Sequence, residues 1–435
     1  MAGPATTAWT RYLLSPALLA AISVGGLAPA EAIRPGDCDG DGNVAISELV
    51  TAVDISLGIA PLVRCRAADR NLDGRVSVDE LVAAVREALD DQPPQQRAFI
   101  VTTNFQAGSF ATIDLDTPRR VSPSSSQRRV HSDAVVRTHG GLIYVVNRLF
   151  GDNIQVLDPN DGFHTISQCS TGNGSNPRDI VVVSEDKAYV TRFEEPDLLV
   201  VNPHPKPDCS DFEIGSINLQ SLADADGIPD MDQMAVVGNR LYVSLQRLDI
   251  NTILRLPAGP GALAVIDTTS DTLIDSIELS GENPFAATKG LTVHNGKLYV
   301  SYSGEFEILD GGIERVDLAT GRPEGIFATE AELGGDLTDF AIVSDRLIYA
   351  IVTRIAFSTA LIAFDPQTPA SPKTILEIDG FDLVDIELND RGELYLADRS
   401  SNRDGIRIYR ASDGSPIVKN PIDLGLAPFE IVFIR

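Results

Sequence analysis

The chain has 435 residues, 43% of them hydrophobic, and its 62 acidic and 35 basic residues give a net charge of −27 at pH 7. This length is sufficient for two or more domains with buried cores. The charge argues against nucleic acid and anionic membranes as partners, because both would repel an acidic protein.

Residues 1–32 are predicted to form a secretory signal peptide. Arg11 is the only charged residue before Glu31, and an apolar run that ends in small residues lies between them. This order is typical of a signal that is cleaved, here after Ala30 or Ala32. No later segment is long and apolar enough to cross a bilayer, so no membrane span is expected after cleavage. The predicted location is secreted or cell-surface, either extracellular or periplasmic.

The four cysteines are Cys38, Cys65, Cys169 and Cys209. An even number in an exported chain predicts two disulfides. Three pairings are possible, and a division into two domains favours Cys38–Cys65 and Cys169–Cys209.

Two acidic loops, Asp37–Glu48 and Asp69–Glu80, follow the signal. Calcium prefers oxygen ligands, and a loop of the EF-hand type supplies them from positions 1, 3, 5, 7, 9 and 12, with glycine at position 6. Both loops have glycine there, and their predicted ligands are Asp37, Asp39, Asp41, the carbonyl of Asn43 and Glu48, then Asp69, Asn71, Asp73, the carbonyl of Arg75 and Glu80. An acidic turn before a helix is the alternative for one such loop, but two matched loops predict two bound Ca²⁺ ions.

Each loop leads into apolar residues at helical spacing, and no helix is expected before the first loop. These residues are Leu49, Val50, Val53 and Leu57 after the first loop and Leu81, Val82, Val85 and Leu89 after the second. A duplicated calcium loop with its exit helix resembles a dockerin module, over residues 33–91. The resemblance implies docking to a cohesin-like or cell-surface protein through Ile46, Ser47, Val78 and Asp79. A calcium-stabilised surface module without such a partner is the alternative.

Residues 92–96 are polar and proline-containing and are predicted to form a linker. From residue 97 to residue 435, a strand-forming segment centred on an aromatic residue recurs seven times, at intervals of 45 to 57 residues. The aromatic residues are Phe99, Tyr144, Tyr189, Tyr242, Tyr299, Tyr349 and Tyr395. Several short strands per repeat of this length are typical of propeller blades. The sequence therefore predicts a mainly β fold, a seven-bladed β-propeller preceded by a small α-helical calcium module.

Residues Ala427–Arg435 resemble the strand that precedes the aromatic residue in the other copies and that the first copy lacks. We expect this segment to be the innermost strand of the blade containing Phe99 and to close the ring, which removes exposed strand edges. The Y-V-V-N sequence at Tyr144–Asn147 and the run that begins at Ile266 resemble surface-layer-type propellers with YVTN repeats. That resemblance implies the fold and leaves the function open.

Two polar columns recur with the repeat. One precedes the aromatic residues and comprises Asp133, Asp179, Asp232, Lys289, Asp339, Asp385 and Glu430. The other follows them and comprises Arg148, Arg192, Arg247, Arg354 and Arg399. Both are expected at one mouth of the central channel, either as a ligand site or as Asp–Arg pairs that join the blades. We favour the pairs, because ion-pair networks recurring in every blade are more often structural.

Two further features bear on function. The stretch Asp224–Asp232 has the D-x-D-G-x-x-D spacing of thrombospondin-type calcium repeats, so a further ion on the propeller is an open possibility. His131 is the one histidine placed near the channel column. The sequence favours a secreted calcium-binding protein without catalytic activity, whose propeller binds a protein or glycan. The alternative is a propeller hydrolase or lyase, tethered by the small module, that acts on extracellular polysaccharide.

Overall fold

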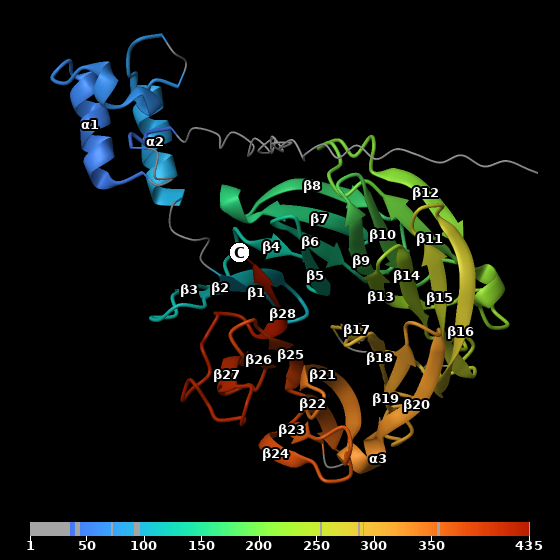
Figure 1. Ribbon diagram of the computed structural model, residues 1–435. Coiled ribbons are helices and arrows are strands. Elements are labelled where there is room, and N and C mark those ends of the chain that lie inside the picture. The colour runs from blue at the N-terminus through green and yellow to red at the C-terminus, as the bar shows by residue number, and fades with distance from the viewer. Residues whose placement is uncertain are drawn as a thin grey trace, which may run out of the picture. The chain divides into compact units, whose positions relative to one another are not determined.

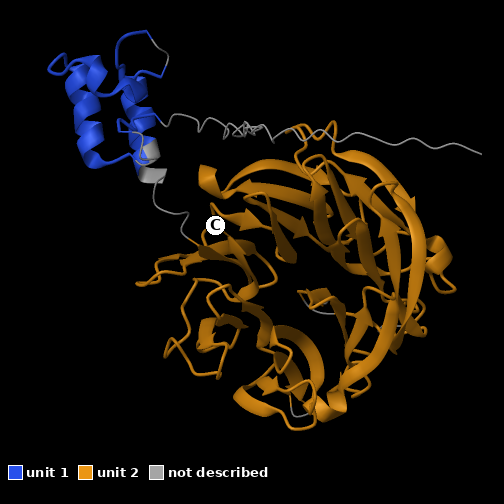
Figure 2. Cartoon of the chain, viewed as in Figure 1, with its two compact units in different colours: residues 1–94 blue, residues 95–435 orange. Residues whose placement is uncertain are grey.

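The computed structural model describes residues 35–39, 44–70, 73–90, 96–252, 255–285, 288–289, 291–354 and 357–434. The chain divides into two compact units, residues 1–94 and residues 95–435 (Figure 2). The predicted signal peptide and residues 92–95 of the predicted linker lie outside the described residues. Among the residues that are described, no helix combines the length and apolar character needed to span a membrane.

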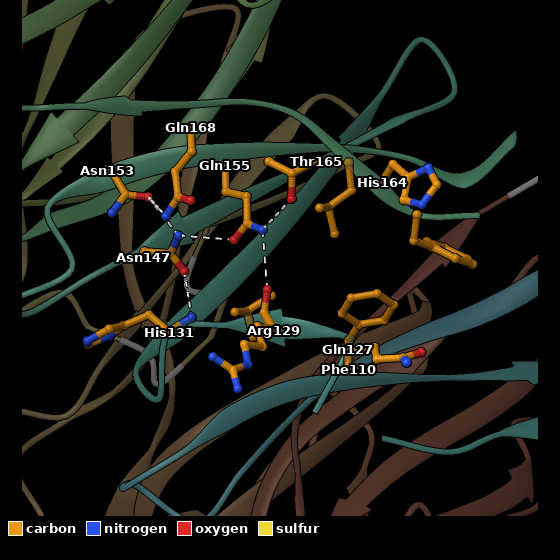
Figure 3. A pocket seen from close by; sticks show the side chains of 13 residues that line it. Phe110, Gln127, Arg129, His131, Asn147, Asn153, Gln155, His164, Thr165 and Gln168 are labelled. Atoms are coloured by element: carbon orange, nitrogen blue, oxygen red, sulfur yellow. Dashed lines mark hydrogen bonds between the residues drawn. The ribbon is translucent and has the colours of Figure 1, made fainter. Parts of the chain in front are cut away.

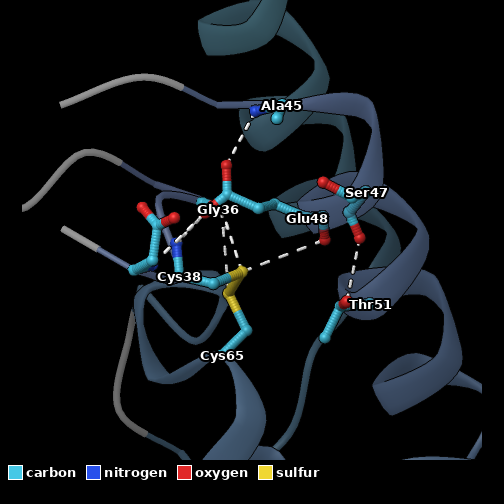
Figure 4. The surroundings of a disulfide bond; sticks show 8 residues. Gly36, Cys38, Ala45, Ser47, Glu48, Thr51 and Cys65 are labelled. Carbon is cyan, nitrogen blue, oxygen red and sulfur yellow. Dashed lines mark hydrogen bonds between the residues drawn. A yellow bond between two sulfur atoms is a disulfide. The ribbon is translucent and has the colours of Figure 1, made fainter. Parts of the chain in front are cut away.

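The first unit contains two α-helices and two short 3-10 helices: α1 (Ile46–Ser56), η1 (Leu62–Arg64), η2 (Arg66–Ala68) and α2 (Val78–Asp90). Its core is small and consists of Ala52, Ile55, Cys65, Ala68 and Val76. The Cys38–Cys65 disulfide, with a Cα–Cα distance of 4.5 Å, anchors the first acidic loop to this core (Figure 4). A unit of this size buries little apolar surface, so a covalent link contributes a large share of its stability.

The second unit is a ring of seven antiparallel sheets, so the predicted seven-bladed β-propeller is confirmed (Figure 1). In chain order the blades are β28-β1-β2-β3 with β4 beside β2, β5–β8, β9–β12, β13–β16, β17–β20, β21–β24 and the three-stranded β25–β27. The strand bounds in the first three blades are β1 Arg97–Thr103, β2 Gly108–Asp114, β3 Val121–Ser122, β4 Arg129–Val130, β5 Ala134–His139, β6 Leu142–Asn147, β7 Asn153–Asp158, β8 His164–Ser170, β9 Pro177–Ser184, β10 Lys187–Arg192, β11 Asp197–Val201 and β12 Glu213–Asn218. The remaining bounds are β13 Met231–Val237, β14 Arg240–Leu245, β15 Pro260–Asp267, β16 Thr272–Glu282, β17 Leu291–His294, β18 Lys297–Tyr302, β19 Gly312–Asp317, β20 Arg322–Thr329, β21 Asp336–Ser344, β22 Leu347–Arg354, β23 Ser358–Phe364, β24 Lys373–Asp379, β25 Leu383–Leu388, β26 Glu393–Asp398, β27 Gly405–Arg410 and β28 Pro428–Ile434.

The aromatic residue of each repeat lies on the second strand of its blade, and all seven are buried. Neighbouring blades cover both faces of these strands, so their residues form nearly continuous apolar runs. The outer strands β8 and β16 instead alternate between buried and exposed residues, because one of their faces meets solvent. Other small helices lie in the loops: η3 (Pro159–Asp161), η4 (Gln220–Leu222) and α3 (Glu330–Leu333).

The C-terminal strand β28 pairs with β1, with Phe99 opposite Val432 and Ile100 opposite Ile431. The two ends of the propeller sequence therefore share one blade, and the ring has no open seam. A second disulfide, Cys169–Cys209, links β8 to the loop between β11 and β12, which belong to neighbouring blades. Both cysteine pairs are those that the domain division favours.

The last blade departs from the expected pattern. After β27, the chain makes only isolated bridges, Tyr409 to Pro416 and Ile406 to Ile422, in place of a fourth strand. Prolines at positions 416 and 421 lack the N–H group that a regular strand would donate there, which accounts for the interruption.

Candidate functional site

The first acidic loop brings three of its predicted ligands together. Carboxylate oxygens of Asp37, Asp39 and Glu48 all lie within 4.8 Å of one another. Glu48 lies in the first turn of α1, where its carboxylate accepts hydrogen bonds from the backbone N–H groups of Cys38 (2.6 Å) and Ala45 (2.7 Å) (Figure 4). The predicted ligands Asp41 and Asn43 lie outside the described residues. An all-oxygen set with several carboxylates matches the preference of Ca²⁺.

The second loop has the same internal connections. Glu80 accepts hydrogen bonds from the backbone N–H groups of Arg70 (2.9 Å) and Ser77 (2.8 Å), which occupy the same loop positions as Cys38 and Ala45. Asp69 accepts from the N–H groups of Asp73 (3.1 Å) and Gly74 (2.9 Å), which curls the loop around its first carboxylate.

Of the other predicted ligands in the second loop, Arg75 donates its backbone N–H to Asp73 (2.9 Å), and Asn71 lies outside the described residues. The shared hydrogen-bond pattern shows that the two loops are structural repeats.

The apolar residues expected on the exit helices mostly face outward. On α1 and the residue after it, Ile46, Val50, Val53 and Leu57 are 42–80% exposed. At the equivalent positions of α2, Val78, Val82 and Val85 are 43–71% exposed. The small core is filled by Ala52 and Ile55 on α1 and by Ala84 on α2, so these side chains form two exposed apolar helix faces.

In the propeller, the predicted carboxylate column lies on the innermost strands and is almost completely buried. These carboxylates accept hydrogen bonds from backbone N–H groups of the next blade: Asp179 from Met234 (2.8 Å), Asp339 from Ile386 (2.9 Å), Asp385 from Ile431 (2.8 Å) and Glu430 from Val136. The column therefore joins blade to blade, as the favoured interpretation had it, but through backbone N–H groups and not through the predicted arginines.

Burial leaves these carboxylates hard to ionise. Desolvation raises the pKa of Asp339 to about 7 and that of Glu430 to about 7. It also raises the pKa of Asp179 and Asp385, against the attraction of Arg137 in the case of Asp179. The innermost strands thus carry groups whose charge changes near neutral pH.

The main counter-charge comes from Arg137, a side chain that the sequence analysis did not single out. Arg137 on β5 contacts Asp179 (Nε, 2.7 Å) and Glu430 (Nη1, 2.7 Å), and it also donates to the carbonyl of Thr288 (3.1 Å). Lys289, which interrupts the column, pairs with Glu387. A basic residue on an innermost strand is the signal that would have identified Arg137.

Asp133 does not belong to the column, which corrects the alignment made from the sequence. It lies in the loop before β5 and pairs with Arg148 (Nε to Oδ1, 2.9 Å). The other predicted arginines also do not reach the channel carboxylates. Arg399, for example, donates to the carbonyls of Pro428 (2.7 Å) and Thr103 (3.0 Å), so it ties the last blade to the first.

Two residues of the stretch Asp224–Asp232, Asp230 and Asp232, make separate contacts within the propeller. Asp230 accepts from the backbone N–H of Leu248 (2.7 Å), and burial, with the nearby charges of Asp226 and Asp224, raises its pKa to about 7. Asp232 lies 3.5 Å from Arg178 at the channel. These contacts show structural uses for Asp230 and Asp232.

His131 lines a cleft of about 520 Å³ beside β7 and β8, not the carboxylate column (Figure 3). The cleft contains a ladder of amide side chains: Asn147 donates to Asn153 (2.8 Å), and Gln155 donates to Thr165 (2.8 Å). Asn147 is 1% exposed and Gln155 is 5% exposed, and both have partners within the protein. The buried amides Asn147 and Gln155 therefore have hydrogen-bond partners within the protein.

A larger pocket of about 860 Å³ lies at the mouth of the channel. It is called the mouth pocket below, and it is lined by polar side chains including Asn176, Arg178, Asn283 and Asp336 and by Phe193, Phe285 and Phe306. Arg178 stacks over the ring of Phe193, 4.7 Å from its centre. Asn176 and Asn283 share a G-x-N-P sequence, residues 174–177 and 281–284, and this is the signal that the sequence analysis did not use.

Exposed phenylalanines occupy the loops of the same face. Phe105, Phe150 and Phe357 lie between the second and third strands of three blades and are 63%, 85% and 55% exposed. Their φ angles are 64°, 66° and 57°, a conformation that bulky residues rarely adopt. Strained, exposed aromatic residues at equivalent loop tips point to a functional face.

No protein-family model and no functionally curated protein matches this sequence. Among solved structures, the chain resembles hydrazine synthase of Kuenenia stuttgartiensis, with 13% identity, a TM-score of 0.51, and coverage of 72% of this chain and 98% of that one. It also resembles a functionally unknown protein from Desulfotomaculum acetoxidans, with 13% identity, a TM-score of 0.50, and coverage of 78% and 99%. At such identities the likeness concerns the fold alone, and the chain is identified by its architecture as a seven-bladed β-propeller with a small helical unit before it.

Proposed function

We propose that this protein is a secreted calcium-binding protein whose propeller is a non-catalytic binding platform for an extracellular protein or glycan. The observation that carries the platform is a pocket of about 860 Å³, with the exposed Phe306 in its lining, on the face whose loops carry other exposed phenylalanines. Pockets of this size that combine apolar walls with a few polar groups are typical ligand sites. The channel carboxylates are engaged in blade-to-blade hydrogen bonds, which supports binding over catalysis at this mouth.

The small unit is proposed to bind two Ca²⁺ ions and to attach the protein to a cohesin-like or cell-surface partner. The clustered carboxylates of Asp37, Asp39 and Glu48 and the matching connections of the second loop support the ions. The two exposed apolar helix faces support attachment, because solvent-exposed apolar surface of this kind often marks a protein contact. Two disulfides are typical of proteins in oxidising compartments and support secretion.

Calcium titration of the full secreted chain tests the metal assignment. We expect two ions to bind, and we expect Glu48→Gln to weaken one site by roughly tenfold or more, because it removes a charged bidentate ligand. Glu80→Gln should weaken the other site to a similar extent. Isothermal titration calorimetry provides the measurement.

The matched control for both variants is Asp54→Asn, which removes a carboxylate on α1 outside the loop and should leave both affinities unchanged. Binding stoichiometry that is the same in the wild type and in a Glu48→Gln/Glu80→Gln double variant would contradict the assignment.

A further inference from the structure

Several buried polar atoms that line the mouth pocket have no hydrogen-bond partner among the described residues. They are Asn176 Oδ1, Gln246 Nε2, Asn283 Oδ1 and Asp336 Oδ1. Asn176 is 7% exposed and Asp336 is 6% exposed, so little bulk solvent reaches them. Leaving a buried polar group unpaired is unfavourable, and several such groups around one pocket indicate that the pocket receives a polar ligand.

The cleft in Figure 3 provides the comparison. It is also lined by amides, but Asn147 and Gln155 are paired with neighbouring side chains. Amides in the mouth pocket differ: Asn283 donates through Nδ2 to the carbonyl of Gly304 (3.0 Å), and its oxygen remains unpaired. Unpaired buried polar atoms also occur elsewhere in the propeller, for example Gln233 Nε2, but in the mouth pocket several of them line one cavity.

The charges around the mouth pocket disfavour an anion. Each of its arginines lies beside a carboxylate: Arg178 is 3.5 Å from Asp232, and Arg255 is 3.0 Å from Glu194. Additional carboxylates in the lining belong to Glu305, Glu307 and Asp336. An anionic ligand would meet cations that are already paired and a surplus of negative charge.

The unpaired atoms also disfavour a simple cation. Asn176 and Asn283 present acceptors, whereas Gln246 Nε2 presents a donor. An ammonium group donates only and would leave the amide N–H of Gln246 without a partner. A hydroxyl group both donates and accepts, so a neutral ligand with several hydroxyls satisfies the whole set.

The apolar part of the lining favours a ring-shaped ligand over a linear polyol. Phe285 and Phe306 line the pocket, and Phe306 is 59% exposed at its rim. The Phe306 ring lies 5.9 Å from that of Phe381, which lies 5.6 Å from that of Phe357. A pyranose ring presents a face of C–H groups to such aromatic surfaces, and a row of three rings extends beyond one sugar unit.

We propose that the mouth pocket binds a neutral oligosaccharide, with one end in the polar pocket and the following sugar units over the cluster of Phe306, Phe381 and Phe357. This inference rests on the proposed role of the propeller as a binding platform, and it names the ligand class and the site. Hydroxyl groups pair with Asn176, Asn283, Asp336 and Gln246, and the pocket volume of about 860 Å³ is near the upper end for small-molecule sites.

The test is to titrate the full secreted protein with four neutral tetrasaccharides: cellotetraose, xylotetraose, laminaritetraose and mannotetraose. Binding is measured by isothermal titration calorimetry and NMR at sugar concentrations up to about 10 mM, at which dissociation constants in the millimolar range are detectable. Tetragalacturonate and chitosan tetramer are the anionic and cationic comparisons. We expect at least one neutral tetrasaccharide to bind. Phe306→Ala should weaken that binding on the order of tenfold, as expected for one lost aromatic contact, and Asp336→Asn should weaken it severalfold.

Ile274→Ala is the control, since Ile274 is an exposed apolar residue on the outer strand β16 and does not line the pocket. It should bind like the wild type. The inference is overturned if only a charged oligosaccharide binds, if no tetrasaccharide binds, or if Phe306→Ala and Asp336→Asn both bind like the wild type. NMR of the sugar over time separates the two proposals: cleavage of a bound neutral oligosaccharide would refute the non-catalytic platform and leave the ligand class intact.

Discussion

Replacing Arg137 with methionine is expected to destabilise the propeller by about 3–5 kcal/mol at neutral to alkaline pH, the usual cost of removing one partner from a buried ion pair. The Arg137 side chain is 20% exposed, and its partners Asp179 and Glu430 are 1% and 3% exposed. Methionine would fill much of the same space and remove only the charge and the hydrogen bonds. Two carboxylates on innermost strands would then lack their cation.

The stability that Arg137→Met removes should depend on pH, because the pKa values of its carboxylate partners are shifted. In the folded protein burial raises the pKa of Glu430 from 4.5 to about 7 and also raises that of Asp179. A raised pKa means that the folded state binds the proton more tightly than the unfolded state, so Glu430 costs stability as pH rises from about 4.5 to about 7. Below its folded-state pKa of about 7 the Glu430 carboxyl is mostly protonated and needs no cation. The loss in Arg137→Met should therefore be smaller at about pH 5.5 than at about pH 8, by about 1–2 kcal/mol.

Urea unfolding of the propeller transition at the two pH values measures this difference. Arg403→Met is the control, because it makes the same change of charge at an exposed loop position, and it should alter the free energy of unfolding by less than about 0.5 kcal/mol at both pH values. An equal loss in Arg137→Met at both pH values would show that the channel carboxylates do not titrate as argued.

Removing the Cys38–Cys65 disulfide is expected to unfold the small unit in the absence of calcium. The bond closes a loop with a sequence separation of 27 residues, for which chain entropy predicts about 3–4 kcal/mol of stabilisation. The core of this unit contains few side chains, and a unit of this size has a total stability of only a few kcal/mol. We therefore expect a Cys38→Ala/Cys65→Ala variant to lose its helical transition in thermal unfolding followed by circular dichroism.

Calcium should restore part of that transition, because an ion that binds only the folded state stabilises it. The matched control is Cys169→Ala/Cys209→Ala, which removes a link with a separation of 40 residues from the propeller. That variant should lower the propeller midpoint and leave the transition of the small unit unchanged. A small unit that melts at the same temperature with and without Cys38–Cys65 would contradict this account.

Much of the propeller could be predicted from the sequence because its blades repeat. The aromatic residue at the second strand recurs because neighbouring blades bury both faces of that strand, so its apolar run cannot vary freely. The carboxylate column recurs for a similar reason, since Asp179, Asp339, Asp385 and Glu430 each accept a hydrogen bond from the backbone of the next blade. The regular spacing fails in the blade after Asp133, because an extra glycine lies between this residue and the aromatic position. The alignment made from the sequence therefore placed the wrong residue in the column.

The sequence by itself determined the number of blades, the strand that closes the ring, and the position of the two acidic loops. Those features depend on local chemistry: periodic apolar runs, turn residues and oxygen-bearing side chains at fixed positions. Only the tertiary structure decided that Arg137 lies between Asp179 and Glu430, and that Asn176, Asn283 and Phe306 from different blades line one pocket. These side chains come from different blades and become neighbours only when the blades pack around one axis, as with Arg137 and Glu430, which are 293 positions apart.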